Sequence, residues 1–198
     1  MVEKLSEDEK QTLLRLAREA LEYRVRGNPL PVVDPATLTP LLHANGASFV
    51  TLTAHGQLRG CIGALEPYQP LYKDVREHAV AAALEDHRFP PVRPSELTRI
   101  HVEVSRLTMP QDLIYQDPDD LLARLQPGID GVILRYGPRR ATFLPQVWSQ
   151  IPDKEEFLSH LCVKMGAASN AWRLRHVDVQ IYRVEEFHEQ DKPVAAQP

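Results

Sequence analysis

The sequence predicts an α+β protein with a mixed, largely antiparallel sheet flanked by helices. Apolar residues recur at helical spacing in several segments, and in others they alternate with polar residues as in half-buried strands. Two pairs of these strands are separated by turns too short to hold a crossover helix, so each pair is expected to form an antiparallel hairpin. Hairpins of this kind argue against a doubly wound parallel sheet.

The N-terminal part of the chain predicts a helix, an extended connection and a hairpin. A capping box at Ser6-Glu-Asp-Glu9 starts a helix that runs to about Tyr23. Four prolines between residues 28 and 40 exclude a helix interior and indicate an extended connection. The next two strands are ASFVTLTA (47–54) and QLRGCIGAL (57–65), which the short turn His55-Gly56 joins.

The rest of the chain alternates helices with strands. Apolar spacing predicts helices over 70–85, 117–125 and 157–165, and Gly166 should end the last of them. Strands are predicted at 100–105 and 177–181, and a second hairpin turns at Gly137-Pro138. The segment DHRFPPVRP (86–94) is irregular and charged, and residues 189–198 form a polar tail that we expect to be disordered.

The composition is that of a folded protein, because 43% of the 198 residues are hydrophobic. The 23 Lys and Arg residues against 27 Asp and Glu give a net charge of -4, so there is no overall electrostatic reason to bind nucleic acid. The N-terminus lacks the basic and then apolar pattern of a signal peptide, and no apolar run reaches the ~20 residues of a membrane helix. We therefore expect a cytoplasmic protein.

The stretch LRGCIG (58–63) places one of only two cysteines in the first hairpin. Counting back from the turn puts Cys61 opposite Val50 and Arg59 opposite Leu52, all on one face of the sheet. Both faces then carry apolar residues. This pattern predicts a sheet that is covered on both sides, with Cys61 beneath the covering element.

Two interpretations of this cysteine are open. Gly60 and Gly63 leave room beside the thiol for another backbone or a ligand, and Arg59, about 7 Å away along the same face, would favour its thiolate. These features suit a nucleophile or a redox thiol. Free cysteines are also among the most buried residues, however, and a cysteine between glycines often only fills a small space. The second cysteine, Cys162, recurs with leucines on an apolar helical stripe and is predicted to be core.

Six motifs occur in order along the chain: LRGCIG, DHRFPP, HVEVSRLT, GIDGVIL, TFLPQVW and FLSHLCVKMG. By these motifs the chain resembles the AMMECR domain family, whose prokaryotic members are called AmmeMemoRadiSam system protein A. The resemblance extends from the first helix to Phe187. It implies an α+β fold in which residues 1–188 form one AMMECR-type domain, with a smaller lobe packed against a larger sheet lobe and the motif-rich cleft where they meet.

The resemblance also implies partners and site residues. Prokaryotic members are often encoded with, or fused to, a Memo-like protein and a radical S-adenosylmethionine protein, and no reaction or cofactor is assigned to the family. The catalytic residues predicted on this basis are Cys61, Arg59, Asp86, Arg88 and Glu103. The predicted ligand-binding residues are Gly60, Gly63, Ser105, Thr142 and Lys164. Arg106 departs from the family pattern, which is mostly apolar at that strand position.

Other roles are open for several of these residues. Asp86 suits a general base and Arg88 an anion-binding group, but both could equally pin the loop to the preceding helix. His101 and Glu103 project from one side of a strand as two metal ligands would; a solvated polar face explains them more simply, and no metal site is predicted. Lys164 near a helix C-terminus complements the helix dipole.

Three functions are compatible with these features. The first is an enzyme or enzyme subunit with a thiol-containing site at the LRGCIG strand. The second is a non-catalytic protein that binds a Memo-like or radical S-adenosylmethionine enzyme or its ligand. The third, disfavoured by the net charge, is an RNA-binding module. A surface for an anionic ligand or RNA would be supplied by Arg135, Arg139, Arg140, Arg173 and Arg175.

Overall fold

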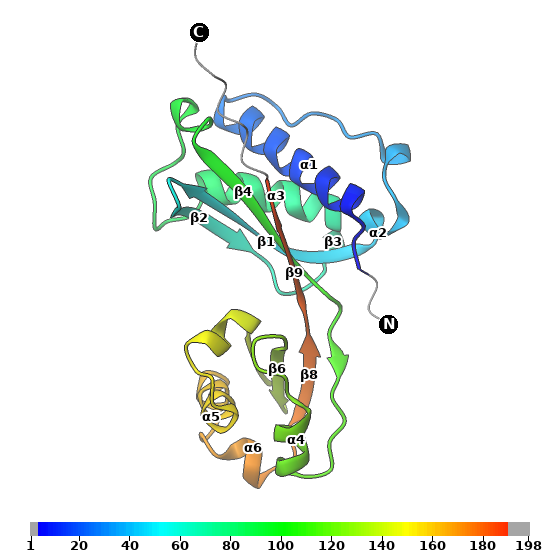
Figure 1. Ribbon diagram of the computed structural model, residues 1–198, viewed down its shortest axis with the longest axis vertical. Coiled ribbons are helices and arrows are strands. Elements are labelled where there is room, and N and C mark those ends of the chain that lie inside the picture. The colour runs from blue at the N-terminus through cyan, green and yellow to red at the C-terminus, as the bar shows by residue number, and fades with distance from the viewer. Residues whose placement is uncertain (1–3, 190–198) are drawn as a thin grey trace. The chain divides into compact units, whose positions relative to one another are not determined.

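The computed structural model describes residues 4–189 and divides them into two compact units (Figure 1). The first unit is formed by residues 4–107 and 185–189, and the second unit is Thr108–Val184. Each unit has its own antiparallel sheet and its own helices, which confirms the predicted α+β class. None of the helices within the described residues is long and apolar enough to cross a membrane.

The sheet of the first unit has the strand order β2-β1-β4-β9, and β3 pairs with β1 beside this path. Its strands are β1 (Asn45–Ala54), β2 (Gln57–Gly63), β3 (Gln69–Pro70), β4 (Ile100–Leu107) and β9 (Val184–His188). The predicted hairpin corresponds to β1 and β2, and its turn residues His55 and Gly56 both have positive φ. The longest pairing is between β1 and β4, which makes these two strands the centre of the sheet.

The helices of the first unit are α1 (Glu7–Val25), α2 (Pro40–His43) and α3 (Leu71–Leu84). The predicted capping box is confirmed, since the Ser6 hydroxyl accepts from the Glu9 amide and the Glu9 carboxylate accepts from the Ser6 amide. The connection over residues 28–40 is less extended than predicted. It contains a 3-10 turn at Pro35–Thr37, and Pro40 starts α2 because a proline fits the first turn of a helix.

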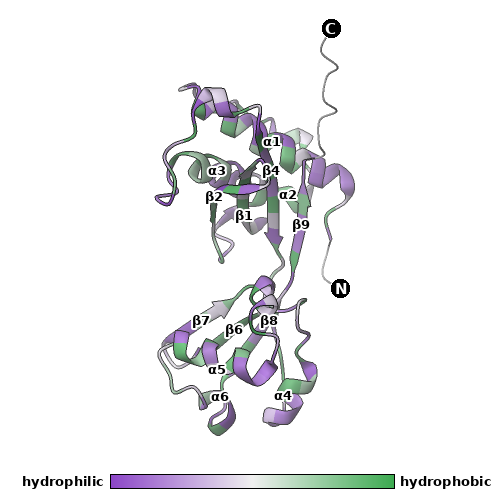
Figure 2. Ribbon diagram, turned by 60° about the vertical axis from the view of Figure 1, so that its left-hand side comes forward, coloured by the Kyte–Doolittle hydropathy of each residue, from purple (hydrophilic) through white to green (hydrophobic). Residues whose placement is uncertain are grey.

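Helices α1 and α3 both pack on one face of this sheet. Their leucines and alanines form one core cluster with Val50 and Leu52 of β1 and with Val102 and Val104 of β4, all fully buried. Figure 2 shows the corresponding alternation of hydrophobic and hydrophilic residues along β4. The side chains between these valines, including Glu103, therefore point to the opposite face.

The sheet of the second unit has the strand order β5-β8-β6-β7. Its elements are β5 (Gln111–Asp112), α4 (Pro118–Arg124), β6 (Gly131–Tyr136), β7 (Arg139–Phe143), α5 (Lys154–Lys164), α6 (Ala171–Leu174) and β8 (Asp178–Tyr182). The hairpin predicted at Gly137-Pro138 is confirmed as β6 and β7. Asp117 caps α4 as expected, and Gly166, with φ of 78°, follows the end of α5.

The second unit has a separate core. The rings of Trp148 and Phe157 stack with centroids 3.5 Å apart, and the Trp148 indole donates to the Asp130 carbonyl at 2.7 Å. Cys162 is fully buried in this cluster, which confirms that it is a core residue. Burial raises the pKa of the Cys162 thiol and so disfavours its reactive thiolate form.

The prediction omitted β9, which follows β8 almost directly and returns the chain to the first unit. Its sequence, VEEFH, has one buried apolar residue, Phe187, and too little alternation to indicate a strand by itself. Of the predicted tail at 189–198, only Glu189 lies within the described residues.

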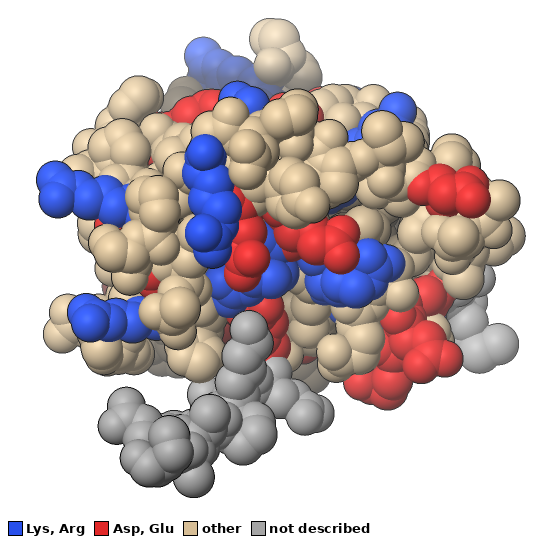
Figure 3. All heavy atoms as spheres, turned by 90° about the horizontal axis from the view of Figure 1, so that it is seen from above, with Lys and Arg blue, Asp and Glu red and all other residues tan. Residues whose placement is uncertain are grey.

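Several charged residues on the first unit form ion pairs. Arg15 and Glu19 lie one turn apart on α1 at 2.9 Å, and Arg18 of the same helix forms an ion pair with Glu189. Figure 3 likewise shows Lys and Arg side chains beside Asp and Glu side chains on the face drawn there. That face therefore has no broad field of one sign of the kind that attracts nucleic acid.

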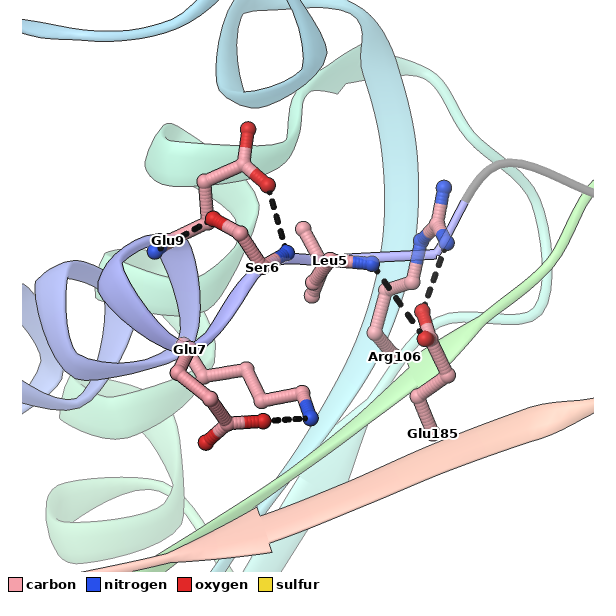
Figure 4. A network of polar contacts seen from close by, with 7 residues as sticks. Leu5, Ser6, Glu7, Glu9, Arg106 and Glu185 are labelled. Carbon is pink, nitrogen blue, oxygen red and sulfur yellow. Dashed lines mark hydrogen bonds and ion pairs between the residues drawn. The ribbon is translucent and has the colours of Figure 1, made fainter.

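Arg106, the departure from the family pattern, belongs to a buried ion pair in the first unit (Figure 4). Its Nη1 atom lies 2.7 Å from Glu185 Oε2 on β9, and both side chains are largely buried. The other oxygen of Glu185 accepts from the Leu5 amide at 3.3 Å, just ahead of α1. Arg106 thus helps to connect β4, β9 and the start of α1.

Candidate functional site

The LRGCIG strand contains a β-bulge that changes the predicted register. Near the turn Thr53 lies opposite Leu58 as expected, but the pairing shifts between Leu52 and Thr53, so that Leu52 lies opposite Gly60. Beyond the shift Cys61 lies opposite Thr51, and its predicted pairing with Val50 is wrong. A bulge adds one residue to one strand and turns every later side chain to the other face.

The bulge places Cys61 on the sheet face that faces away from α1 and α3. Thr51 lies between Cys61 on β2 and Glu103 on β4 as the direct partner of both, so the three side chains form a row across the sheet. The Thr51 hydroxyl donates to the Cys61 Sγ atom at 3.3 Å. Cys61 is partly exposed. We expected covering elements on both faces of this sheet. The helices of the first unit pack on one face only, and Cys61 lies on the other face.

The two glycines of the motif allow close packing within the protein. A Cβ atom at Gly60 would lie 2.0 Å from the Ala82 carbonyl oxygen of α3, and one at Gly63 would lie 2.4 Å from the Phe49 ring. Both distances are far below contact. The space that we predicted beside the thiol is therefore occupied, at Gly60 by the backbone of α3 and at Gly63 by β1.

Arg59 is paired with a carboxylate instead of the thiol. Its Nε and Nη2 atoms donate to the two oxygens of Glu96 at 2.9 and 3.3 Å, a fork-to-fork ion pair with little solvent exposure on the arginine side. The pair connects β2 to the 3-10 turn at Pro94–Glu96. Arg59 is thus engaged away from Cys61, and its predicted effect on the thiolate has no support in this geometry.

Asp86 anchors the DHRF corner to the cysteine. Its carboxylate accepts from the Cys61 amide at 2.9 Å and from the Arg88 amide and guanidinium at 2.7–3.1 Å. These bonds, those of the Arg88 side chain above all, hold the pKa of Asp86 well below its usual range. A carboxylate so stabilised is a poor proton acceptor near neutral pH. The geometry therefore favours Asp86 as the residue that pins the loop over Asp86 as a general base.

Arg88 is the cation next to the cysteine. Its Nη2 atom donates to the Cys61 carbonyl at 3.1 Å while it also binds Asp86. Asp86 chiefly raises the pKa of Arg88, and the Cys61 side chain contributes in the same direction. The Arg88 side chain is 57% exposed, so a guanidinium edge held in place by Asp86 is presented to solvent beside the thiol.

Glu103 is the titratable group at the other end of the row. Burial raises the pKa of its carboxyl group, the nearby Glu186 adds to the rise, and His188 opposes it. Both neighbours are on β9. A carboxyl group with a raised pKa on a partly polar surface is typical of residues that exchange protons with a ligand.

Replacing Glu103 with glutamine is expected to stabilise the protein at pH 7.5 but not at pH 4. The raised pKa means that the folded state disfavours the charged carboxylate, so the contribution of Glu103 is favourable at low pH and is lost as pH rises through its folded pKa. Urea unfolding of the wild type and Glu103→Gln across this range measures the difference. A gain that is the same at both pH values would contradict the assignment.

The remaining predicted residues are divided between the units. Ser105 is buried on β4 two residues from Glu103. Thr142 and Lys164 belong to the second unit, where the Lys164 ammonium donates to the Thr142 carbonyl at 2.9 Å and lies 4.9 Å from the centre of the Phe143 ring. Lys164 is also the last residue of α5, as its predicted dipole role requires. Asp86, Arg88, Glu103, Ser105 and the LRGCIG residues lie within the first unit.

Thr51 and Glu96 are not among the site residues predicted from the sequence. Thr51 becomes a partner of Cys61 only because of the bulge, for which a glycine inside a strand is the available signal. Glu96 meets Arg59 through the fold of residues 86–96, and no local pattern indicates this pair. No group of three or more His, Cys, Asp or Glu side chains suited to holding a metal ion is found in residues 4–189.

Comparison with known proteins assigns the chain to a family. The family model described as AMMECR1 matches residues 14–187, which include both units almost entirely. The chain belongs to the AMMECR1 family. The match includes the row formed by Cys61, Thr51 and Glu103, so the candidate site lies on the family domain.

Relatives in archaea extend over nearly the whole AMMECR1 chain. A protein of Methanothermobacter thermautotrophicus is 40% identical over 186 residues, which are 93% of this chain and 96% of the relative. A Thermofilum pendens protein is 39% identical and covers 92% of this chain and 89% of its own. The crystal structure of uncharacterized protein PH0010 from Pyrococcus horikoshii is 33% identical, with a TM-score of 0.76 over 94% of both chains.

Proposed function

We propose that this AMMECR1-family protein is an enzyme or enzyme subunit that uses Cys61 as a nucleophile. The observation that carries the proposal is the environment of the sulfur: a partly exposed thiol accepts a hydrogen bond from Thr51 and lies beside the fixed guanidinium of Arg88. A hydroxyl donor and a guanidinium are groups that stabilise negative charge on sulfur. A cysteine that only fills space requires neither of them.

The row across the sheet suggests how the residues would divide the chemistry. The Cys61 thiolate would form a bond to an electrophilic carbon of the substrate, and the displaced electron pair would move to the attached oxygen or nitrogen. Glu103, whose carboxyl pKa burial raises, would exchange a proton with that atom. Arg88 would bind an anionic group of the substrate, and Asp86 would act as a positioning residue through Arg88.

The proposed partners are a Memo-like protein and a radical S-adenosylmethionine protein. Their support is the family resemblance, since the association of these three proteins is a feature of prokaryotic AMMECR members. If the three proteins act in one pathway, one of the partners would make or consume the group that becomes bonded to the Cys61 sulfur. The cofactor of the radical enzyme would then belong to the partner.

Co-expression with both partners from one genome tests this function. Intact-protein mass spectrometry is expected to find an adduct on the wild type that maps to the peptide with Cys61, is absent in Cys61→Ser and is reduced in Arg88→Gln. Cys162→Ser is the matched control and should keep the adduct, because Cys162 is buried in the second unit. An adduct-free wild type, or the same adduct in Cys61→Ser, would contradict the proposal.

A non-catalytic docking role is the second candidate, and one observation favours it. The polar face with Cys61 and Glu103 is the face of its sheet on which neither α1 nor α3 packs. Such a face can receive a partner protein or a ligand. The same co-expression distinguishes the roles, because partners that co-purify with wild type and Cys61→Ser alike, without any adduct, indicate docking alone.

A further inference from the structure

The second unit has a groove of about 400 Å³ that the proposed function does not use. It is formed by the tip of the β6–β7 hairpin on one side and by residues 167–175, around α6, on the other. Tyr136, Leu174 and three alanines give it a largely apolar lining, and none of the lining residues within the described part of the chain is acidic. Its volume is within the range of pockets that hold small molecules.

Two arginines of this groove carry charge that no carboxylate among the described residues neutralises. Arg139 Nη1 donates to the Gly166 carbonyl at 2.5 Å, and Arg175 Nη1 donates to the Tyr136 hydroxyl at 2.9 Å. Both acceptors are neutral. Within residues 4–189 neither arginine has an ion pair, whereas the neighbouring Arg173 lies 2.7 Å from Glu155.

The contacts also fix the two side chains in place. Arg175 lies over the Tyr136 ring at 5.8 Å from its centre, and Tyr136 is the cross-strand partner of Arg139. The guanidiniums are thus held at one groove by contacts that leave most of their N–H groups free. Leu174, between Arg173 and Arg175 in sequence, is 71% exposed, an unusual exposure for a leucine that lines a groove.

We propose that this groove binds a small organic anion with a carboxylate or phosphate group on an apolar body. Arg139 and Arg175 would bind the anionic group, because the planar guanidinium matches the geometry of both oxyanions. Leu174, Tyr136 and the alanines would cover the apolar body. The amide of Asn170, which has no hydrogen-bond partner among the described residues, would supply a further donor or acceptor at the rim.

NMR titration of the full ¹⁵N-labelled chain in 150 mM NaCl tests this proposal with four probes: 1-naphthyl phosphate, 1-naphthol, inorganic phosphate and a twelve-nucleotide single-stranded RNA. We expect 1-naphthyl phosphate to shift the amides of Tyr136, Gly137, Arg139 and residues 166–175 and to bind about tenfold more tightly than the other small probes, because only it has both the charge and the apolar body. Arg139→Gln and Arg175→Gln should each weaken its binding by about tenfold.

Arg173→Gln is the matched control, since it removes the same charge from the same segment at a residue already paired with Glu155. It should change the affinity by less than about twofold. Equal weakening by Arg173→Gln, shifts confined to other residues, or no binding of 1-naphthyl phosphate would overturn the proposal. RNA binding without naphthyl phosphate binding would overturn it in favour of a nucleic-acid surface. Intact spectra of the variants show that they fold, and Cys61→Ser leaves this readout unchanged whatever the role of Cys61.

Discussion

Replacing Gly60 with alanine is expected to lower the free energy of unfolding by at least about 3 kcal/mol, the upper part of the range for overpacked sites. The added Cβ atom would lie 2.0 Å from the Ala82 carbonyl oxygen, and this neighbour is helix backbone that cannot rotate away. Strand β2 and helix α3 would have to separate. Urea unfolding followed by circular dichroism measures the loss.

The matched control is Cys61→Ala, one residue further along the same strand on the opposite face. It should change the free energy of unfolding by no more than about 1 kcal/mol, because a partly exposed side chain loses little packing. A Gly60→Ala protein as stable as Cys61→Ala would show that β2 does not pack on α3 as described. The close approach at Gly60 would then not explain the glycine in the motif.

Arg106→Met is expected to cost roughly 3 kcal/mol of unfolding free energy, as breaking a buried ion pair generally does. The substitution keeps the length of the side chain but leaves Glu185 as a buried carboxylate without the guanidinium that lies 2.7 Å away. The start of α1 should loosen as well, since Glu185 also accepts from the Leu5 amide. Urea unfolding gives the energy, and hydrogen exchange of residues 5–10 reports the loosening.

The double variant Arg106→Met with Glu185→Gln separates the cost of an unpaired buried charge from the cost of lost side-chain packing. It should recover part of the stability because no uncompensated charge is left in the interior. Arg15→Met is the control at an exposed ion pair, and it should have a much smaller effect. An Arg106→Met effect no larger than that of Arg15→Met would contradict the buried pair.

The longer helices α1, α3, α4 and α5 and the two hairpins could be predicted because their signals are local. The Ser6 capping box, the Gly137 turn and the apolar stripe that includes Cys162 all appear in the structure where the sequence indicates them. Strand β9 could not be predicted in this way. It is a strand because it pairs with β4, and the contact continues one residue past its end, where the Glu189 amide donates to the Val102 carbonyl at 3.0 Å.

The candidate site could be located from the sequence but not assembled from it. The LRGCIG motif and the DHRF corner do meet, through the bond from the Cys61 amide to Asp86. The sequence could not predict that Arg88, and not Arg59, lies beside the thiol. The choice depends on a bulge of one residue and on Glu96, which is distant in sequence and binds Arg59. The alternation of polar and apolar residues does not reveal a register shift when both faces of a strand carry small or apolar residues.

The rate of iodoacetamide labelling at Cys61 in the folded protein tests the central claim most directly. At one fixed pH, in the folded Cys162→Ala background, we predict fast labelling that is slowed about tenfold in Arg88→Gln and by less than about twofold in Arg59→Gln, whose arginine is paired with Glu96. Thr51→Val should also slow it, since the hydroxyl that donates to the sulfur is removed. Labelling that appears only on unfolding, or that Arg59→Gln slows as much as Arg88→Gln, would contradict the account of Cys61 as a nucleophile supported by Arg88.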